Sequence, residues 1–139
     1  MNQKKRTLEI GIEGKQSLTV SDELTAAAMG SGELPIYATP AVVELIENTA
    51  MNSIRECLED GQGSVGTRID IRHISASPVG MAVSCCTKLI EIDRKRLVFK
   101  TTVSDFCGLI AEGIHERFII DQQQFLEKAQ KKSISENRF

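Results

Sequence analysis

Aromatic residues and histidines are scarce in this sequence, and long apolar runs are missing. Aromatic residues make up 4% of the 139 positions, tryptophan is absent, and there are two histidines. A formal net charge of −2 argues against nucleic acid and anionic membranes as partners. No segment approaches the roughly 18 consecutive apolar residues of a membrane span, and Met1–Arg6 leads into an alternating segment rather than a signal sequence. We therefore expect a cytoplasmic protein.

The cysteine pattern does not indicate a disulfide framework or a metal site. Cys57, Cys85, Cys86 and Cys107 show no C-x-x-C spacing, and the few histidines do not complete a metal site. Adjacent Cys85 and Cys86 would point to opposite faces of a strand, which is poor geometry for a bridge. We expect reduced, mostly buried thiols without a catalytic role, and neither a metal nor another cofactor.

Length and composition are those of a single globular domain. The hydrophobic fraction of 41% and the charged fraction of 26% are ordinary for such a domain. A chain of 139 residues is long enough for one core but short for two. We expect one domain over residues 1–139, with frayed ends at residues 1–6 and 131–139.

The longest helical pattern runs from Tyr37 to Asp60. Thr39 followed by Pro40 indicates an N-cap and a proline at the first helical position, because the hydroxyl can accept from a free amide and the proline lacks only an unused N–H. Leu45 lies on the otherwise polar face of this helix, where a monomer would leave it exposed. Apolar residues at helical spacing predict a core-facing stripe, made of Val43, Ile46, Ala50, Ile54, Cys57 and Leu58.

The rest of the chain predicts mainly antiparallel strands, because apolar and polar residues alternate between turn residues. Before the long helix we expect a bent edge strand (Thr7–Glu13 with Gln16–Val20), a short helix (Ser21–Ala28) and a loop (Met29–Ile36). After it we expect strands Ser64–Ile74, Met81–Ile92, Leu97–Ser104 and Leu109–Ile120, then a terminal helix capped by Asp121 with Gln124 as its capping-box partner. A long sheet with one apolar face and one helix to cover it predicts an α+β hotdog fold, in which the curved sheet wraps around the long central helix.

Two polar residues fall on faces that the pattern assigns to the core. Glu47 lies within the apolar stripe of the helix. His73 shares a strand face with Ile71, whereas Gly66 shares the opposite, solvated face with Arg68. Each polar residue has an ordinary explanation, namely a carboxylate that reaches solvent at the edge of the stripe and a core histidine whose hydrogen bonds are satisfied. The alternative is a functional pair, in which each partner offsets the burial cost of the other.

Short motifs at defined spacing resemble those of a known family. They are Ala38-Thr39-Pro40, Glu47, Gly63-Ser64-Val65-Gly66-Thr67, His73, Ser77-Pro78-Val79-Gly80 and Gly113-Ile114-His115-Glu116-Arg117-Phe118. Over roughly residues 20–128 this set resembles the fluoroacetyl-CoA thioesterase-like family of hotdog proteins. The resemblance implies that Thr39, Glu47 and His73 form a catalytic set, with Gly66 and Arg117 at the substrate. It also implies a homodimer, or a higher oligomer, with acyl-CoA lying across the subunit interface.

The resemblance predicts an acyl-CoA thioesterase, and the alternative is a non-catalytic hotdog module that binds acyl-CoA or a related ligand. Thioester hydrolysis needs a nucleophile and oxyanion donors, and the amides at the start of the long helix are suitable donors. Glu47 would act as general base or as nucleophile, and His73 would position it, shuttle the proton or protonate the leaving thiolate. Thr39, which N-capping alone also explains, lies about 12 Å from Glu47 along the helix axis. The set therefore closes around a bound thioester or across a dimer interface.

The chain departs from the family in the segment over the site. Members specialised for fluoroacetyl-CoA place bulky aromatic residues there, whereas Met29–Tyr37 has Tyr37 as its only aromatic residue. We therefore expect a small or medium acyl group rather than fluoroacetate. Arg117 would hold a carboxylate or phosphate oxygen or pair with an acid, and His115 is expected to be structural or exposed. The edge strand of the predicted sheet also favours a homodimer, because a second sheet can pair with it.

Overall fold

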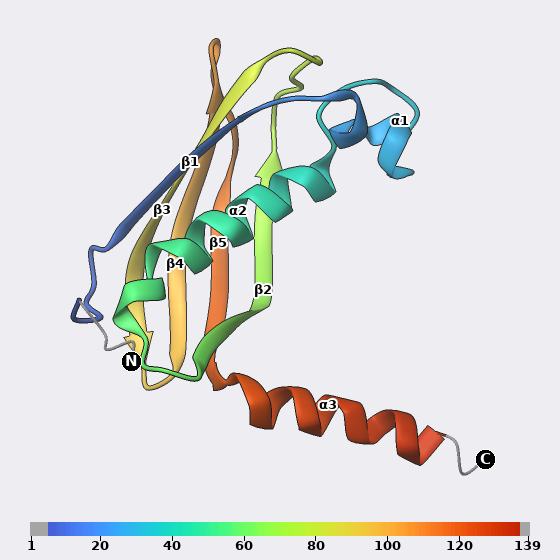
Figure 1. The fold of residues 1–139 in the computed structure, drawn as a ribbon. Helices are drawn as coiled ribbons and strands as arrows, with labels where there is room; N and C mark the ends of the chain where they lie inside the picture. Colours follow the sequence, from blue (N-terminus) through green and yellow to red (C-terminus); the bar gives the residue numbers. More distant parts are fainter. Residues whose placement is uncertain (1–5, 137–139) are drawn as a thin grey trace.

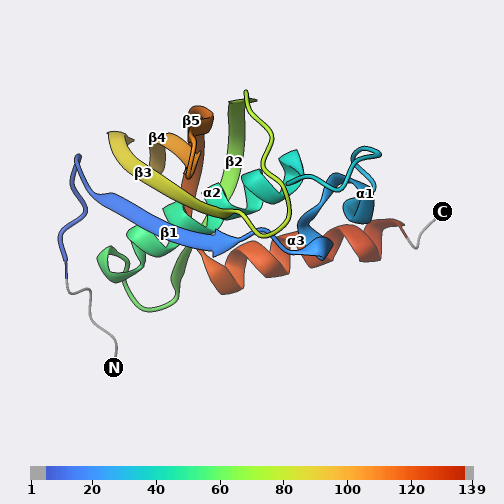
Figure 2. The same cartoon turned by 90° about the horizontal axis from the view of Figure 1, so that it is seen from above.

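One long helix lies across a curved antiparallel sheet in the computed structural model, which describes residues 6–136 and the side chains of residues 6–133 (Figure 1). The helix is α2 (Thr39–Ser53), and the five strands follow the order β1-β3-β4-β5-β2. Seen from above, the strands form an arc around α2 (Figure 2). This is the predicted α+β hotdog arrangement. The strands are β1 (Glu13–Thr19), β2 (Gln62–His73), β3 (Ala82–Asp93), β4 (Arg96–Asp105) and β5 (Gly108–Asp121).

Helix α2 is shorter than predicted at its C-terminus and is capped differently at its N-terminus. It ends at Ser53, where the hydroxyl donates back to the Ala50 carbonyl at 2.7 Å, and the chain continues as a 3-10 turn, η2 (Arg55–Cys57). Such local side-chain bonds compete with helical ones. At the start, Ala38 is the N-cap residue and Thr39 is already helical, without a side-chain cap. The predicted N-cap role of Thr39 is therefore wrong.

The buried face of α2 is wider than one stripe. The sheet wraps around the helix, so both flanks of the predicted stripe meet strands. Leu45 is only 4% exposed, so the expectation that a monomer leaves it wet is wrong, and Val43 is only half-buried. Glu44 and Asn48, on the polar face of the helix, are exposed. The two main core clusters share α2 and include Val42, Ile46, Ala50, Ile54, Val83, Leu89, Leu97 and Phe99, all 0% exposed.

The N-terminal elements differ from the predicted ones. Of the expected bent strand, the part from Glu13 onward forms β1. Before it the chain turns at Gly11, where φ is 102°, although the Gly11 amide still donates to the Leu89 carbonyl of β3. The expected helix over Ser21–Ala28 is split into η1 (Asp22–Leu24) and α1 (Ala26–Met29). Thr25 rather than Ser21 caps α1, since its hydroxyl accepts from the Ala28 amide at 3.2 Å. The loop before Tyr37 is present as predicted.

A register shift in β2 changes which residues face α2. Pairing with β5 is interrupted between Gly66 and Arg68, which is a β-bulge at Thr67. Because an extra residue reverses the alternation, Gly66 lies on the same face as His73 and Ile71. The prediction that Gly66 shares the solvated face with Arg68 is therefore wrong. The bulge turns the Gly66 backbone toward the helix.

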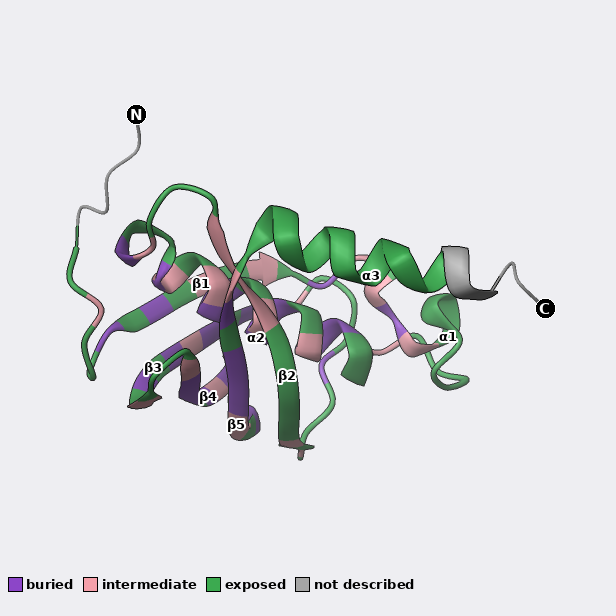
Figure 3. Ribbon diagram, turned by 90° about the horizontal axis from the view of Figure 1, so that it is seen from below, coloured by how far each residue is buried: buried purple, intermediate pink, exposed green. Residues whose placement is uncertain are grey.

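The terminal helix, α3 (Gln122–Glu136), starts as predicted, with the Asp121 carboxylate accepting from the Gln124 amide at 3.0 Å. It continues through residues 131–136, where the sequence predicted a frayed end, and residues 137–139 lie outside the described part. At the other end, the Arg6 amide donates to the Glu56 carbonyl, and residues 1–5 lie outside the described part. Helix α3 leads away from the sheet (Figure 1), and its described side chains are exposed (Figure 3).

None of the four cysteines, all within the described residues, forms a disulfide, as predicted. Cys57 and Cys85 are buried, Cys86 is half-buried and Cys107 is exposed, so the prediction of buried thiols is confirmed only for Cys57 and Cys85. None of the helices in the described region is long and apolar enough to cross a membrane.

Candidate active site

Thr39 and His73 meet where α2 begins and β2 ends. The Thr39 hydroxyl lies 2.8 Å from Nδ1 of His73, and the ring of Tyr37 meets the imidazole edge-on at 6.5 Å between centroids. Burial lowers the pKa of His73, and the nearby backbone of Ser75 partly opposes this. The other ring nitrogen, Nε2, is buried and has no hydrogen-bond partner among the described residues.

The Thr39–His73 pair borders a cavity of about 270 Å³. One wall is formed by the end of β2 and the residues that follow it. The opposite wall is formed by α1 and the loop that precedes α2. Tyr37 is the only Phe, Tyr or Trp among the residues that line this cavity. The remaining lining residues are Ala26, Ser31, Ile36, Ile74, Ser75 and Ala76.

Glu47 and Arg117 form a second group further along α2. Nη1 of Arg117 lies 3.9 Å from Oε2 of Glu47, which is too long for a hydrogen bond. The Arg117 side chain is 5% exposed and that of Glu47 is 45% exposed, so the carboxylate predicted within the stripe reaches solvent. Nε and Nη2 of Arg117 donate to the hydroxyl and carbonyl oxygens of Ser64, each at 2.8 Å. Burial lowers the pKa of Arg117, and the charge of Glu47 partly opposes this.

At Gly66 the backbone of β2 lies directly against this second group, with no side chain between them. A Cβ atom at Gly66 would overlap Oε2 of Glu47 and would lie 3.2 Å from Cε1 of His115 and 3.5 Å from Nη1 of Arg117. Only glycine therefore leaves room for the carboxylate here. A cleft of about 220 Å³ opens beside it, and Val43 and Ile69 supply its apolar wall.

The predicted site residues thus lie in two groups within one chain. Thr39 contacts His73, whereas Glu47 approaches Arg117 and Gly66. Among the described side chains, neither a hydrogen bond nor an ion pair joins Glu47 to His73, so the predicted pair does not form within one protomer.

Sequence reasoning missed two residues of the second group. His115, expected to be structural or exposed, is 0% exposed and touches Arg117 through Nε2 at 3.2 Å. Ser64 supplies both oxygens that hold the Arg117 guanidinium. The signals were available, because Ser64 lies in the Gly63–Thr67 motif and His115 stands two residues before Arg117 on the same strand face.

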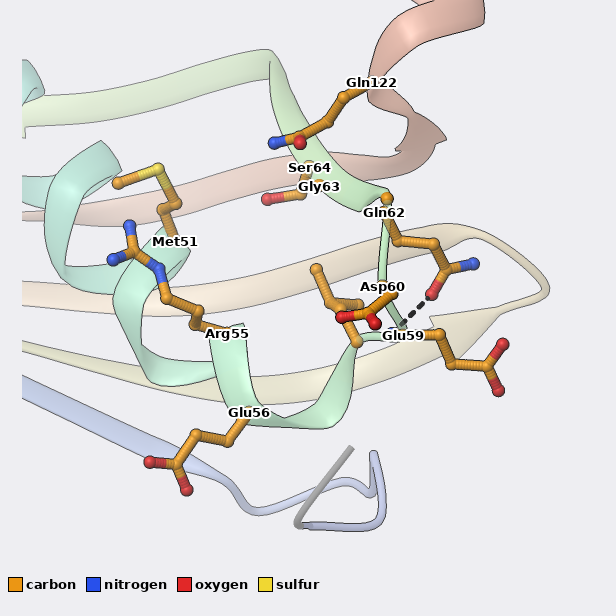
Figure 4. Close-up of a pocket in the computed structure, with 11 residues that line it drawn as sticks. Met51, Arg55, Glu56, Glu59, Asp60, Gln62, Gly63, Ser64 and Gln122 are labelled. Atoms are coloured by element: carbon orange, nitrogen blue, oxygen red, sulfur yellow. Dashed lines mark hydrogen bonds between the residues drawn. The ribbon is translucent and has the colours of Figure 1, made fainter. Parts of the chain in front are cut away.

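A larger cavity of about 400 Å³ lies between the end of α2, the start of β2 and Gln122 (Figure 4). Ser64 borders it, but none of the five predicted site residues does. In Figure 4 the side chains of Glu56 and Glu59 point away from the opening. Nowhere in residues 6–133 do three His, Cys, Asp or Glu side chains gather in a way that could hold a metal ion.

Comparison with known proteins assigns the family. A family model described as fluoroacetyl-CoA-specific thioesterase matches residues 20–123. The chain belongs to this family. It is similar to the fluoroacetyl-CoA thioesterase of Streptantibioticus cattleyicolor, with 32% identity over 98 residues that cover 70% of each protein. Membership places it in the hotdog thioesterase superfamily.

Solved structures of the same family agree with the fold. A mutant of the fluoroacetyl-CoA thioesterase in complex with fluoroacetate aligns with a TM-score of 0.85 at 27% identity, covering 90% of this chain and 98% of that one. Another mutant, in complex with acetyl-CoA, aligns with a TM-score of 0.86 over the same shares. A thioesterase superfamily member from Thermus thermophilus aligns with a TM-score of 0.88 at 22% identity, covering 96% and 99%, and supports the fold alone.

Proposed function

We propose that the protein hydrolyses a small or medium acyl-CoA thioester to the free acid and CoA. The observation that carries this proposal is the Thr39–His73 pair, whose buried Nε2 lacks a partner at the edge of a cavity. The family's activity on a CoA thioester agrees with it. The acyl group is not fluoroacetyl in this proposal, since Tyr37 is the only aromatic residue in the Met29–Tyr37 segment.

The reaction needs a proton acceptor, an oriented nucleophile and a donor for the oxyanion. Neutral His73 can accept the proton of Thr39 or position the hydroxyl, because its lowered pKa keeps it unprotonated near neutral pH. Glu47, whose Oε2 lies 3.9 Å from the Arg117 guanidinium, would act as general base on water or as nucleophile. The Gly66 backbone can approach the acyl group closely. At the start of α2 the Thr39 amide can face the oxyanion, because Pro40 has no N–H and the next two amides donate to the Ala38 carbonyl.

We further propose that the two groups act together across a homodimer. β2 is an edge strand of the sheet, with β5 as its only neighbour among the described strands, and such an edge favours pairing with a second copy. Phe125 and Leu126 of α3 are 46% and 57% exposed and would be covered in an oligomer. In this arrangement the Thr39–His73 pair of one protomer and Glu47 of the other act on the same thioester.

Two assays test these proposals. Pure protein is incubated with a panel of acyl-CoAs of increasing chain length and a thiol reagent, and thiol release with at least one short or medium acyl group is expected. Saturable binding without thiol release would instead support the non-catalytic module. Analytical ultracentrifugation at micromolar concentration should show a dimer, and a clean 15.3 kDa monomer would contradict the shared site.

Mixing two inactive variants tests the shared site directly. Each homodimer of His73→Ala or Glu47→Gln should be nearly inactive. If the site is shared, unfolding and refolding a 1:1 mixture yields heterodimers with one intact site, so about a quarter of the wild-type activity per chain should return. If His73 and Glu47 of the same protomer act together, every heterodimer lacks an intact site and mixing restores nothing.

A further inference from the structure

His115 lies beneath the second group of the proposed site, on the face of β5 that turns toward α2. It is 0% exposed, and its ring stacks on Phe99 with centroids 6.2 Å apart and planes 28° apart. On another side it meets the backbone at Gly66, where a Cβ atom would come within 3.2 Å of Cε1. A fully buried imidazole in this position has little freedom to rotate or to move away.

The hydrogen-bond partners of His115 determine its protonation state. Nδ1 lies 2.7 Å from the carbonyl oxygen of Arg68, which only accepts, so Nδ1 carries the hydrogen. Nε2 lies 3.2 Å from Nη1 of Arg117, and a guanidinium only donates, so Nε2 presents its lone pair. The ring is therefore the neutral Nδ1–H tautomer. Burial lowers the pKa of His115 and Arg117 adds to this, while the Arg68 carbonyl and the charges of Glu47 and Glu116 oppose it.

The Arg117 guanidinium is held at each of its nitrogens. Nε and Nη2 donate to Ser64, and Nη1 donates to His115. Nη1 is also the nitrogen recorded 3.9 Å from Oε2 of Glu47. One Nη1 hydrogen is therefore used by His115, and the other remains for Glu47 or for an oxygen of the substrate. The planar guanidinium cannot turn without losing these bonds.

We propose that His115 is a positioning residue of this site, which as a neutral acceptor orients the Nη1 group of Arg117 toward Glu47 and the bound thioester. The inference rests on the proposed function. The bulge in β2 contributes as well, because the Arg68 carbonyl beside it fixes which nitrogen of His115 is protonated. Protonation of Nε2 would set an N–H against a guanidinium N–H and place two positive charges side by side.

Three substitutions separate positioning from packing. His115→Gln can place an amide oxygen near the position of Nε2 and so keep an acceptor for Arg117. His115→Asn can keep a donor near Nδ1 for the Arg68 carbonyl, and His115→Phe keeps a ring on Phe99 without either hydrogen bond. With the acyl-CoA that the wild type hydrolyses best, kcat should fall about tenfold to a hundredfold in the Asn and Phe variants and recover largely in Gln. Urea unfolding of all three shows how much of each loss is structural.

The pattern of recovery decides the proposal. Full activity in His115→Phe would mean that the His115 ring serves only for packing. Recovery of kcat in His115→Asn but not in His115→Gln would mean that only the hydrogen bond to the Arg68 carbonyl at the bulge matters. Either result overturns positioning through Arg117. Greater acid sensitivity of kcat in the wild type than in His115→Gln is expected too, because the amide does not titrate.

A measurement without substrate distinguishes failure of this inference from failure of the proposed function. The sequence has two histidines, so long-range ¹H–¹⁵N correlation spectra of the wild type and of His73→Asn assign His115 unambiguously. The Nδ1–H tautomer is expected. The ring should stay neutral until the pH is below 6.5, the ordinary pKa of histidine. An Nε2–H tautomer, or protonation at or above that value, overturns the inference. A wild type without turnover refutes the proposed function alone, and the spectra still decide how His115 holds Arg117.

Discussion

Replacing Gly66 with alanine should disable the proposed site while leaving the fold largely intact. The added methyl would overlap Oε2 of Glu47 and come within 3.2 Å of Cε1 of His115. Buried His115 cannot retreat, whereas the Glu47 side chain is 45% exposed and can swing outward. The carboxylate must then move by about 1 Å or more, a displacement that costs about a hundredfold in rate when it affects a reacting group. Gly66 does not have a positive φ, so alanine adds no backbone strain.

The expected result is a kcat lowered about a hundredfold, with overpacking costing at most about 1–3 kcal/mol of stability. Thiol release from acyl-CoA gives kcat and KM, and urea unfolding gives stability. Gly63→Ala is the matched control, because Gly63 lies on the same strand and the three atoms nearest to its methyl would all belong to the flexible Gln122 side chain. The control should change kcat by about twofold or less. Equal kcat values for the two variants would refute the placement of Glu47 as a reacting group.

Further outcomes are expected from the same geometry. Glu47→Gln and His73→Ala should each lower turnover about a hundredfold or more in steady-state kinetics. The double variant should be little worse than either, because residues that act as a unit are non-additive. Unchanged hydrolysis with a lower melting temperature would mean that the two residues are structural. The free energy of unfolding should fall as the pH falls through about 6.5, because burial lowers the pKa of His73 and His115 and the unfolded chain takes up protons first. Urea titrations between about pH 5 and 8 measure this, and a flat profile would contradict it. Gly113→Ala should cost about 3 kcal/mol or more, since its Cβ would run into the β2 backbone at Asp70 and Ile71, and an unchanged urea midpoint would contradict that packing. Replacing all four cysteines with Ala or Ser should preserve most turnover, because none of them is in a disulfide and burial raises the pKa of Cys85 to about 11. A loss of several orders of magnitude would contradict this.

The sequence by itself determined the architecture and the identity of several unusual residues. Helical spacing marked α2, strand alternation marked the antiparallel meander, and the Asp121 carboxylate marked the start of α3. These are local signals, since each depends on neighbours within a few positions along the chain. The same patterns singled out Glu47 and His73, because a polar side chain in an apolar stripe is visible without any tertiary information.

Tertiary structure alone decided how those residues are used. The bulge at Thr67 reverses the strand alternation and turns Gly66 toward α2, and a bulge arises from pairing with a distant strand rather than from local periodicity. Thr39 bonds to His73, 34 positions away, instead of capping its own helix. Arg117 is held by Ser64, 53 positions away, and by His115. Side-chain partners so far apart are set by how the sheet curves around the helix, which brings together groups that no periodic pattern relates.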